Sequence, residues 1–219
     1  IINGRIQDNP RFFAHSQTIS LLLKRNAKVV ILAHQGNPGD KDFTNLEQHS
    51  RILNKYVKVK FVNEVIGKRA LSEIKKLKPG QAILLDNVRK LKEEFKPSKN
   101  NKLVNILSEN ADYYVNDAFS VMHRDQTSIV SFPSVLKSAI GPNVENELKN
   151  IDKLKSRLNG CIFILGGRKI KDVSLLLNQK KILSTGILSL IALKIKGHHL
   201  GKEEKILKAG MEALYKYPI

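Results

Sequence analysis

Short apolar runs alternate with helix-like segments through the first half of the chain, and this alternation restricts the fold more than any other feature of the sequence. The apolar runs are residues 27–33, 57–62, 81–86 and 113–115. Around them, apolar residues recur at helical spacing at about 11–24, 44–53, 70–77 and 101–110. Strands joined by helices need crossover connections, which are right-handed and give parallel sheets. The sequence therefore predicts an α/β fold, with a Rossmann-like parallel sheet of four strands sandwiched by helices.

Polar and cationic side chains follow three of these runs at the point where each run ends. His34 follows the first run, Arg89 the third, and His123 and Arg124 the fourth. Because the carboxyl ends of neighbouring parallel strands lie side by side, we expect these side chains to line one cationic crevice. An arginine there presents a fork of donors that suits a phosphate or a carboxylate. Taken by itself, Arg124 is better interpreted as a surface arginine on a loop, and only its agreement with the other strand ends favours a binding role.

Several local signals predict how individual residues are used. The helix that starts near residue 44 is expected to open with a capping box formed by Thr44 and Glu47. Asn116 and Asp117 are turn formers, and we expect their side chains to bind their own local backbone. Cys161 is the only cysteine and lies in the apolar run 161–165, which predicts a buried strand thiol in a reducing compartment.

The pattern breaks after Ser131, where prolines and glycines interrupt it, and this predicts a domain organisation. We expect a first domain over residues 1–142, a connecting helix over 143–158 and the start of a second α/β domain over 159–219. In the second domain, a turn at residues 166–169 and a helix near 171–178 separate two predicted strands. Two strands would leave apolar faces and sheet edges uncovered. We therefore expect the second domain to continue beyond residue 219. The chain also starts without Met, and we expect that a segment precedes it in the natural protein.

Composition favours a globular protein but leaves the charge to be explained. The chain has 38 basic and 20 acidic residues, a net charge of +18, which ordinarily points to nucleic acid or another polyanion. Few aromatic residues accompany the lysines, so solvated surface lysines remain the default interpretation. The first residues lack the features of a secretory signal, and no run of eighteen apolar residues occurs, so a cytoplasmic location without membrane insertion is expected. Metal binding by His198 and His199 is disfavoured, since no further ligand lies at suitable spacing.

Five stretches, taken in order along the chain, resemble the phosphoglycerate kinase family and in particular its archaeal branch. They are HQGNPGDKDFTNLEQH at 34–49, LLDNVRKLKEE at 84–94, YYVNDAFSVMHRDQTS at 113–128, GPNVENELKNI at 141–151 and ILGGRKIKD at 164–172. Five ordered motifs make the resemblance specific. It implies a two-domain kinase fold with a substrate-binding domain and a nucleotide-binding domain. The implied reaction transfers a phosphoryl group from 1,3-bisphosphoglycerate to ADP and gives 3-phosphoglycerate and ATP. Mg²⁺ is expected on the nucleotide phosphates.

The resemblance also implies roles for individual residues. Those expected to bind the glycerate substrate are Arg11, His34, Gln35, Gly36, Asn37, Arg89 and Arg124. Arg11 is further expected to reach the phosphoryl group in transfer, where negative charge on three oxygens calls for donors. The nucleotide phosphates are assigned to Gly166, Gly167 and Lys169, as backbone amides and one lysine suit that task. No residue is assigned to a metal, and no P-loop sequence is present.

Departures from the family pattern keep an alternative open. Asn37 stands where family members usually have an arginine, Arg168 replaces a small residue, and Val173 stands where many non-archaeal members have a second lysine. The family's first strand and its later nucleotide-binding motifs are missing, so the 219 residues alone are not expected to turn over. The alternative is a catalytically degenerate relative that keeps the fold and binds RNA, the ribosome or another polyanion. Such binding would weaken steeply with salt.

Overall fold

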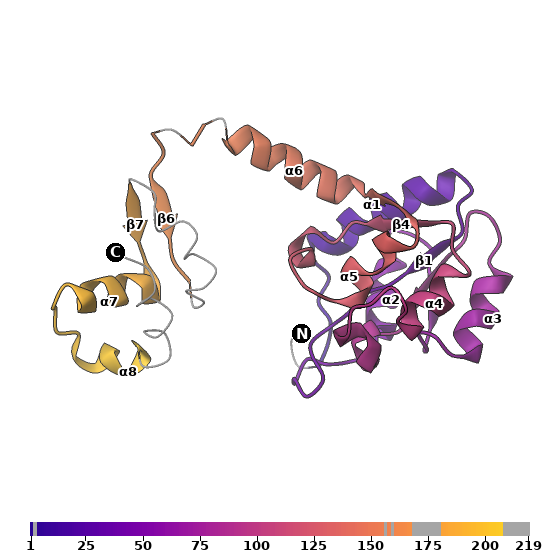
Figure 1. The fold of residues 1–219 in the computed structure, drawn as a ribbon, viewed down its shortest axis with the longest axis horizontal. Helices are drawn as coiled ribbons and strands as arrows, with labels where there is room; N and C mark the ends of the chain where they lie inside the picture. The colour runs from indigo at the N-terminus through magenta and orange to yellow at the C-terminus, as the bar shows by residue number, and fades with distance from the viewer. Residues whose placement is uncertain (2–3, 156, 159, 168–180, 208–219) are drawn as a thin grey trace. The chain divides into compact units, whose positions relative to one another are not determined.

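A computed structural model describes residues 1, 4–155, 157–158, 160–167 and 181–207 of the chain (Figure 1). It contains two compact units, Ile1–Ile151 and Asp152–Ile219. Within the described ranges, no helix has the length and the apolar character needed to cross a membrane.

The first unit is built on a parallel sheet of three strands in the order β1-β3-β2. The strands are β1 Val29–Ile31, β2 Lys60–Val62 and β3 Ala82–Leu85. Val29 lies opposite Ala82 and Lys60 lies opposite Ile83. The helices around the sheet are α1 Pro10–Lys24, α2 Glu47–Leu53, α3 Lys68–Lys76, α4 Lys102–Ser108 and α5 Thr127–Val130. The predicted α/β class with parallel strands is confirmed.

Alternating side chains of β3 pack against helices on the two faces of this sheet, because successive residues of a strand point to opposite faces. Ala82 and Leu84 belong to a core with Ile19 of α1 and Leu53 of α2. Ile83 and Leu85 belong to a second core with residues of α3 and α4. All four residues of β3 are buried, so this strand is the centre of the unit.

The fourth predicted strand does not join the three-stranded sheet within the described residues. β4, Tyr113–Asn116, instead pairs in parallel with β5, Lys137–Ile140, and the two form a separate two-stranded sheet. The expectation of one four-stranded sheet was therefore wrong. β5 was not predicted, because its four residues are all exposed and carry no apolar periodicity.

Helix starts in this unit are fixed partly by local and partly by distant residues. Asn9 caps α1, its side chain accepting a hydrogen bond from the Arg11 backbone N–H at 3.0 Å. The predicted capping box of α2 is wrong: Leu46 occupies the cap position, and Asp86, which follows β3, accepts from its N–H at 3.1 Å. The hydrogen bond at the start of α2 is therefore accepted by Asp86, forty residues away, and not by the predicted cap Thr44.

Helix α6, Pro142–Lys155, follows β5 and continues past Ile151 into the second unit. That unit contains a parallel pair, β6 Phe163–Leu165 and β7 Ile182–Ser184, followed by α7 Gly186–Ile195, a 3-10 turn η7 Gly201–Glu203 and α8 Glu204–Leu207. Leu165, Leu188, Ile191 and Leu207 form its core. Cys161 lies before β6 and is exposed, so the prediction of a buried thiol was wrong. The helix expected near 171–178 lies outside the described residues.

Candidate functional site

The first part of the candidate site is the Gly36 loop, residues 34–45, which leaves β1 and leads to α2. Gly36 adopts a φ of +63°, and a Cβ there would lie 2.7 Å from the Phe43 backbone nitrogen, so the close turn requires glycine. The Gln35 side chain donates to Asp42 Oδ2 at 2.8 Å. Asn37 donates from its backbone and side-chain nitrogens to Asp40 Oδ2 at 3.0 and 2.7 Å. The side chains of Gln35 and Asn37 therefore hold the loop's own shape.

Arg89 lies beneath this loop and is the most deeply buried cation of the site. It belongs to a 3-10 turn, η1 Val88–Lys90, that follows β3, and it is 3% exposed. Its Nη1 donates to the Gly36 carbonyl at 2.7 Å, and its Nη2 donates to Gln126 Oε1 at 3.3 Å. Its Nε is buried and has no hydrogen-bond partner among the described residues. Two of the five guanidinium N–H donors are therefore used among the described residues, and the group keeps further donors that suit an anionic oxygen.

His34 and Arg124 complete the cationic cluster, which we define as His34, Arg89 and Arg124. Burial lowers the pKa of His34, and the positive charges of Arg89 and Arg124 add to the effect, so that the pKa falls to about 4. The pKa of Arg89 is lowered by burial and then by the charge of Arg124. These mutual effects place the three side chains within electrostatic reach of one another. At neutral pH the imidazole of His34 is therefore neutral, and the two arginines supply the positive charge.

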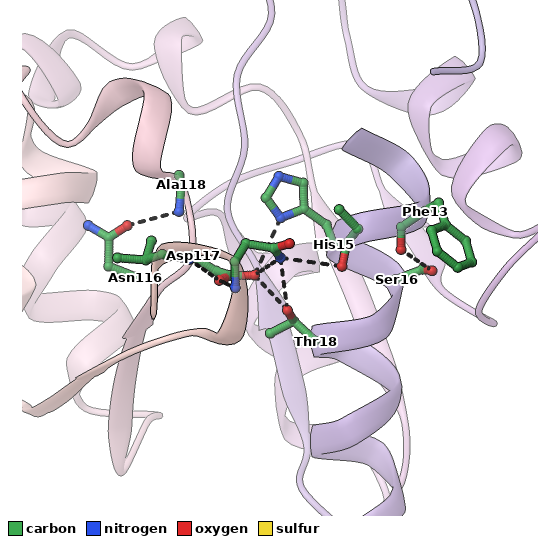
Figure 2. A network of polar contacts seen from close by, with 10 residues as sticks. Phe13, His15, Ser16, Thr18, Asn116, Asp117 and Ala118 are labelled. Atoms are coloured by element: carbon green, nitrogen blue, oxygen red, sulfur yellow. Dashed lines mark hydrogen bonds and ion pairs between the residues drawn. The ribbon is translucent and has the colours of Figure 1, made fainter. Parts of the chain in front are cut away.

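Arg11 lies on α1, and a network around Asp117 orients the face of the helix that carries it. Arg11, His15 and Thr18 recur at positions i, i+4 and i+7 and so share one face of the helix. Thr18 Oγ1 donates to Asp117 Oδ2 at 2.6 Å, and His15 Nδ1 lies 3.5 Å from the same oxygen. Figure 2 shows both side chains reaching from α1 toward Asp117. Within the described part of the chain, no hydrogen bond or ion pair holds the exposed Arg11 guanidinium.

Asp117 also fixes the start of α6, which contradicts the expectation that its side chain binds its own turn. Its Oδ1 accepts from the Asn143 N–H at 2.8 Å and from the Val144 N–H at 3.3 Å. Its Oδ2 accepts from Asn143 Nδ2 at 2.5 Å. Only Asn116 makes the predicted local bond, as its Oδ1 accepts from the Ala118 N–H at 3.0 Å (Figure 2). Asp117 thus ties α1, the end of β4 and α6 together.

The glycines assigned to nucleotide phosphates lie after β6 in the second unit. A Cβ on Gly166 would lie 2.0 Å from Thr185 Oγ1, and Gly167 has a φ of +125°, so both positions require glycine. A tight glycine turn leaves its backbone amides open to a phosphate, which fits the expected ligand. Lys169 and the departures Arg168 and Val173 lie outside the described residues.

The structure brings His34, Gly36, Arg89 and Arg124 together in the first unit, although β4 is not in the same sheet as β1 and β3. The sequence did not identify Gln126, whose side chain accepts from Arg89; its only signal was its place two residues after Arg124. Two cations beside a neutral imidazole, with a guanidinium N–H that has no partner among the described residues, make an arrangement whose chemistry suits a small, multiply charged anion. Among the described residues, no group of three histidine, cysteine or acidic side chains is placed to bind a metal ion.

Comparison with known proteins identifies one family. The family model described as phosphoglycerate kinase matches residues 1–216. The chain is 41% identical over 214 residues to the phosphoglycerate kinase of Sulfurisphaera tokodaii, an alignment that covers 91% of this chain and 52% of the relative. It is 42% identical over 200 residues to that of Pyrobaculum aerophilum, covering 88% of this chain and 48% of the relative.

A solved structure agrees with these sequence relatives. The crystal structure of phosphoglycerate kinase from Pyrococcus horikoshii OT3 matches with a TM-score of 0.85 and 31% sequence identity. The match covers 99% of this chain and 57% of that chain. The present chain thus spans about half the length of the curated relatives it matches.

Proposed function

The chain belongs to the phosphoglycerate kinase family, and on that premise we propose that the protein transfers a phosphoryl group between ATP and 3-phosphoglycerate. In this reaction a carboxylate oxygen of 3-phosphoglycerate attacks the γ-phosphorus of ATP. The new P–O bond forms as the bond to ADP breaks, which gives 1,3-bisphosphoglycerate and ADP. The reverse reaction makes ATP. The protein's place is then in glycolysis and gluconeogenesis, in the cytoplasm.

The observation that carries this proposal is the buried guanidinium of Arg89 with its unpartnered Nε. Burying an arginine with an unsatisfied donor costs stability unless a ligand uses that donor. Arg124 lies within electrostatic reach, so an anion bound here would face two positive charges. 3-Phosphoglycerate, which carries a phosphate and a carboxylate, is an anion that two positive charges would attract. In this assignment Arg89, Arg124 and His34 hold the glycerate substrate, with Gln35, Gly36 and Asn37 forming the loop over it.

Arg11 is assigned to the phosphoryl group in transfer. In phosphoryl transfer, catalysis consists mainly of positioning and of neutralising charge on the three equatorial oxygens. An exposed guanidinium at the start of α1 is free to make such contacts. Gly166, Gly167 and Lys169 would hold the nucleotide phosphates, and Mg²⁺ bound to those phosphates would reduce their negative charge.

The polyanion-binding alternative rests on the net charge of +18 and on the departures from the family pattern at Asn37 and Arg168. No contact among the described residues adds support to it. Asn37, which motivated it, takes part in an ordered loop through Asp40, so a neutral amide at this position is compatible with a formed site.

The proposal predicts that Arg89→Ala weakens 3-phosphoglycerate binding about 10- to 100-fold, the range for losing a hydrogen-bonded charged contact. The measurement is isothermal titration calorimetry on the complete gene product. Arg69→Ala is the matched control, because Arg69 is an exposed arginine on α3 of the same unit. Equal dissociation constants for wild type and Arg89→Ala, in a folded variant, would contradict the assignment of this site.

A further inference from the structure

Glu94 is a fully buried acidic residue close to the cationic cluster, and the proposed reaction gives it no role. It lies in a 3-10 turn, η2 Lys92–Phe95, and is 0% exposed. A carboxylate without access to water is costly unless its oxygens are hydrogen-bonded and its charge is balanced. Its contacts therefore indicate why it is there.

Both oxygens of Glu94 accept hydrogen bonds from one residue, Ser128. The Ser128 N–H donates to Oε2 at 2.9 Å, and the Ser128 hydroxyl donates to Oε1 at 2.6 Å. Burial raises the pKa of Glu94, while the two hydrogen bonds from Ser128 and the charge of Arg89 act in the opposite direction and favour the ionised carboxylate. Tyr114, on β4, donates from its hydroxyl to the Ser128 carbonyl at 2.9 Å. Ser128 is thus held through its amide, its side chain and its carbonyl.

The segment 126–128 is fixed to η2 by a second set of contacts. Thr127 Oγ1 donates to the Glu93 carbonyl at 2.6 Å, and Asn101 Nδ2 donates to Thr127 Oγ1 at 3.1 Å. Gln126, next along the chain, is 8% exposed and accepts from Arg89 Nη2. Glu94 is therefore linked to the Arg89 guanidinium by hydrogen bonds at both ends of segment 126–128, with the backbone of that segment joining Ser128 to Gln126.

We propose that Glu94 is a positioning residue for Arg89, and that it sets the affinity of the cationic cluster for its anionic substrate through Ser128 and Gln126. This inference rests on the proposed function, because the substrate used to test it is 3-phosphoglycerate. Glu94 does not contact the substrate. It holds segment 126–128 where Gln126 accepts from one nitrogen of Arg89 and so fixes the position of the guanidinium. The negative charge of Glu94 also opposes the cost of burying the arginine.

Charge alone would have the opposite effect on binding. The negative charge of Glu94 raises the pKa of Arg89, so the two side chains interact electrostatically. If Glu94 acted only through its charge, it would repel an incoming anion. Removing it would then tighten substrate binding. If instead Glu94 positions Arg89, removing its charge and one acceptor weakens binding. The sign of the change in the dissociation constant separates the two mechanisms.

The test is a double-mutant cycle in the complete gene product, with the dissociation constant of 3-phosphoglycerate measured by calorimetry. We expect Glu94→Gln, which replaces one accepting oxygen with a donor, to weaken binding roughly five- to tenfold, the order of one hydrogen bond. Ser128→Ala removes one of the two bonds with less disturbance of the fold, and a smaller loss in the same direction is expected. In the Arg89→Ala background, neither change is expected to alter binding further.

Glu93→Gln is the matched control, because its side chain lies next to Glu94 in the same turn but is only partly buried; it is expected to bind like wild type. Tighter binding by Glu94→Gln, or an equal loss with and without Arg89, would overturn the inference. A loss of stability with unchanged affinity would show a purely structural role and would also overturn it. If Arg89→Ala itself leaves binding unchanged, the proposed substrate site is wrong. That result differs from a failure of the Glu94 inference alone, in which Arg89→Ala still weakens binding.

Discussion

Replacing Arg11 with alanine is expected to lower kcat of the complete gene product about a thousandfold, the lower range for removing an arginine that stabilises phosphoryl transfer. Negative charge spread over the transferring group is greatest in the transition state, so a guanidinium that contacts it there acts on kcat more than on KM. The placement supports this role. Arg11 shares a helical face with His15 and Thr18, which face Asp117, and its own guanidinium is exposed at the start of α1.

Steady-state turnover of ATP with 3-phosphoglycerate measures this effect. Arg11→Lys keeps the charge but loses the planar fork of donors, so it should recover only part of kcat. Arg25→Ala is the control, since Arg25 is an exposed arginine at the other end of the same helix. A folded Arg11→Ala protein with wild-type kcat would remove Arg11 from the reaction.

Replacing Asp117 with alanine is expected to lower the free energy of unfolding of the unit that contains it by about 3 kcal/mol, from the loss of several hydrogen bonds to a charged group and of the cap of α6. The Asp117 carboxylate accepts from Thr18 on α1 and from Asn143 and Val144 at the start of α6. Its side chain is only 13% exposed, so water replaces these partners poorly. The loss should therefore be among the largest for any single polar residue of the unit.

The same contacts predict how the stability from Asp117 depends on pH. Desolvation by burial is the largest single influence and raises the pKa of Asp117, but hydrogen bonds from His15, Thr18 and Asn143 together outweigh it and lower the pKa to about 2 from an ordinary value of 3.8. A carboxyl whose pKa is lower in the folded state stabilises the fold above the unfolded value and loses that contribution as the pH falls from about 4 to about 2. The difference corresponds to about 2 kcal/mol.

Urea unfolding at pH 7 and at pH 3, followed by circular dichroism, measures both effects. Asp117→Asn should remove the part that depends on charge, and the variant should then show a smaller loss of stability between the two pH values than wild type. Asp112→Ala is the control, because Asp112 is an exposed aspartate just before β4. If Asp117→Ala were as stable as this control, the network in Figure 2 would contribute nothing to the fold.

Local periodicity was enough to predict much of the fold and part of the site. The apolar runs contain β1, β2, β3 and all but the last residue of β4, and the spacing of apolar residues predicted α1 to within one residue. The position of arginines after strands predicted that Arg89 and Arg124 lie near His34. These predictions depend on properties of single segments, namely burial on one or both faces and the direction in which a strand ends.

Features that depend on contacts between distant residues could not be predicted in the same way. Asp86 fixes the start of α2, and Asp117 joins α1 to α6 across 99 and 26 residues. Neither partner is marked by its local sequence, and the local rule for Asp117 pointed to the wrong partner. The strand β5 and the acidic residue Glu94 are similar cases. Strands are usually buried on at least one face, but β5 is exposed at all four residues, and acidic residues are usually exposed, but Glu94 is buried. In all four cases, contacts with residues distant in the sequence determine the observed structure.

The most direct test of the proposed activity is ADP formation by the complete gene product supplied with ATP, Mg²⁺ and 3-phosphoglycerate. We expect ADP formation that depends on 3-phosphoglycerate and saturates with it. A folded protein that binds both substrates and forms no ADP beyond the rate without 3-phosphoglycerate would contradict it.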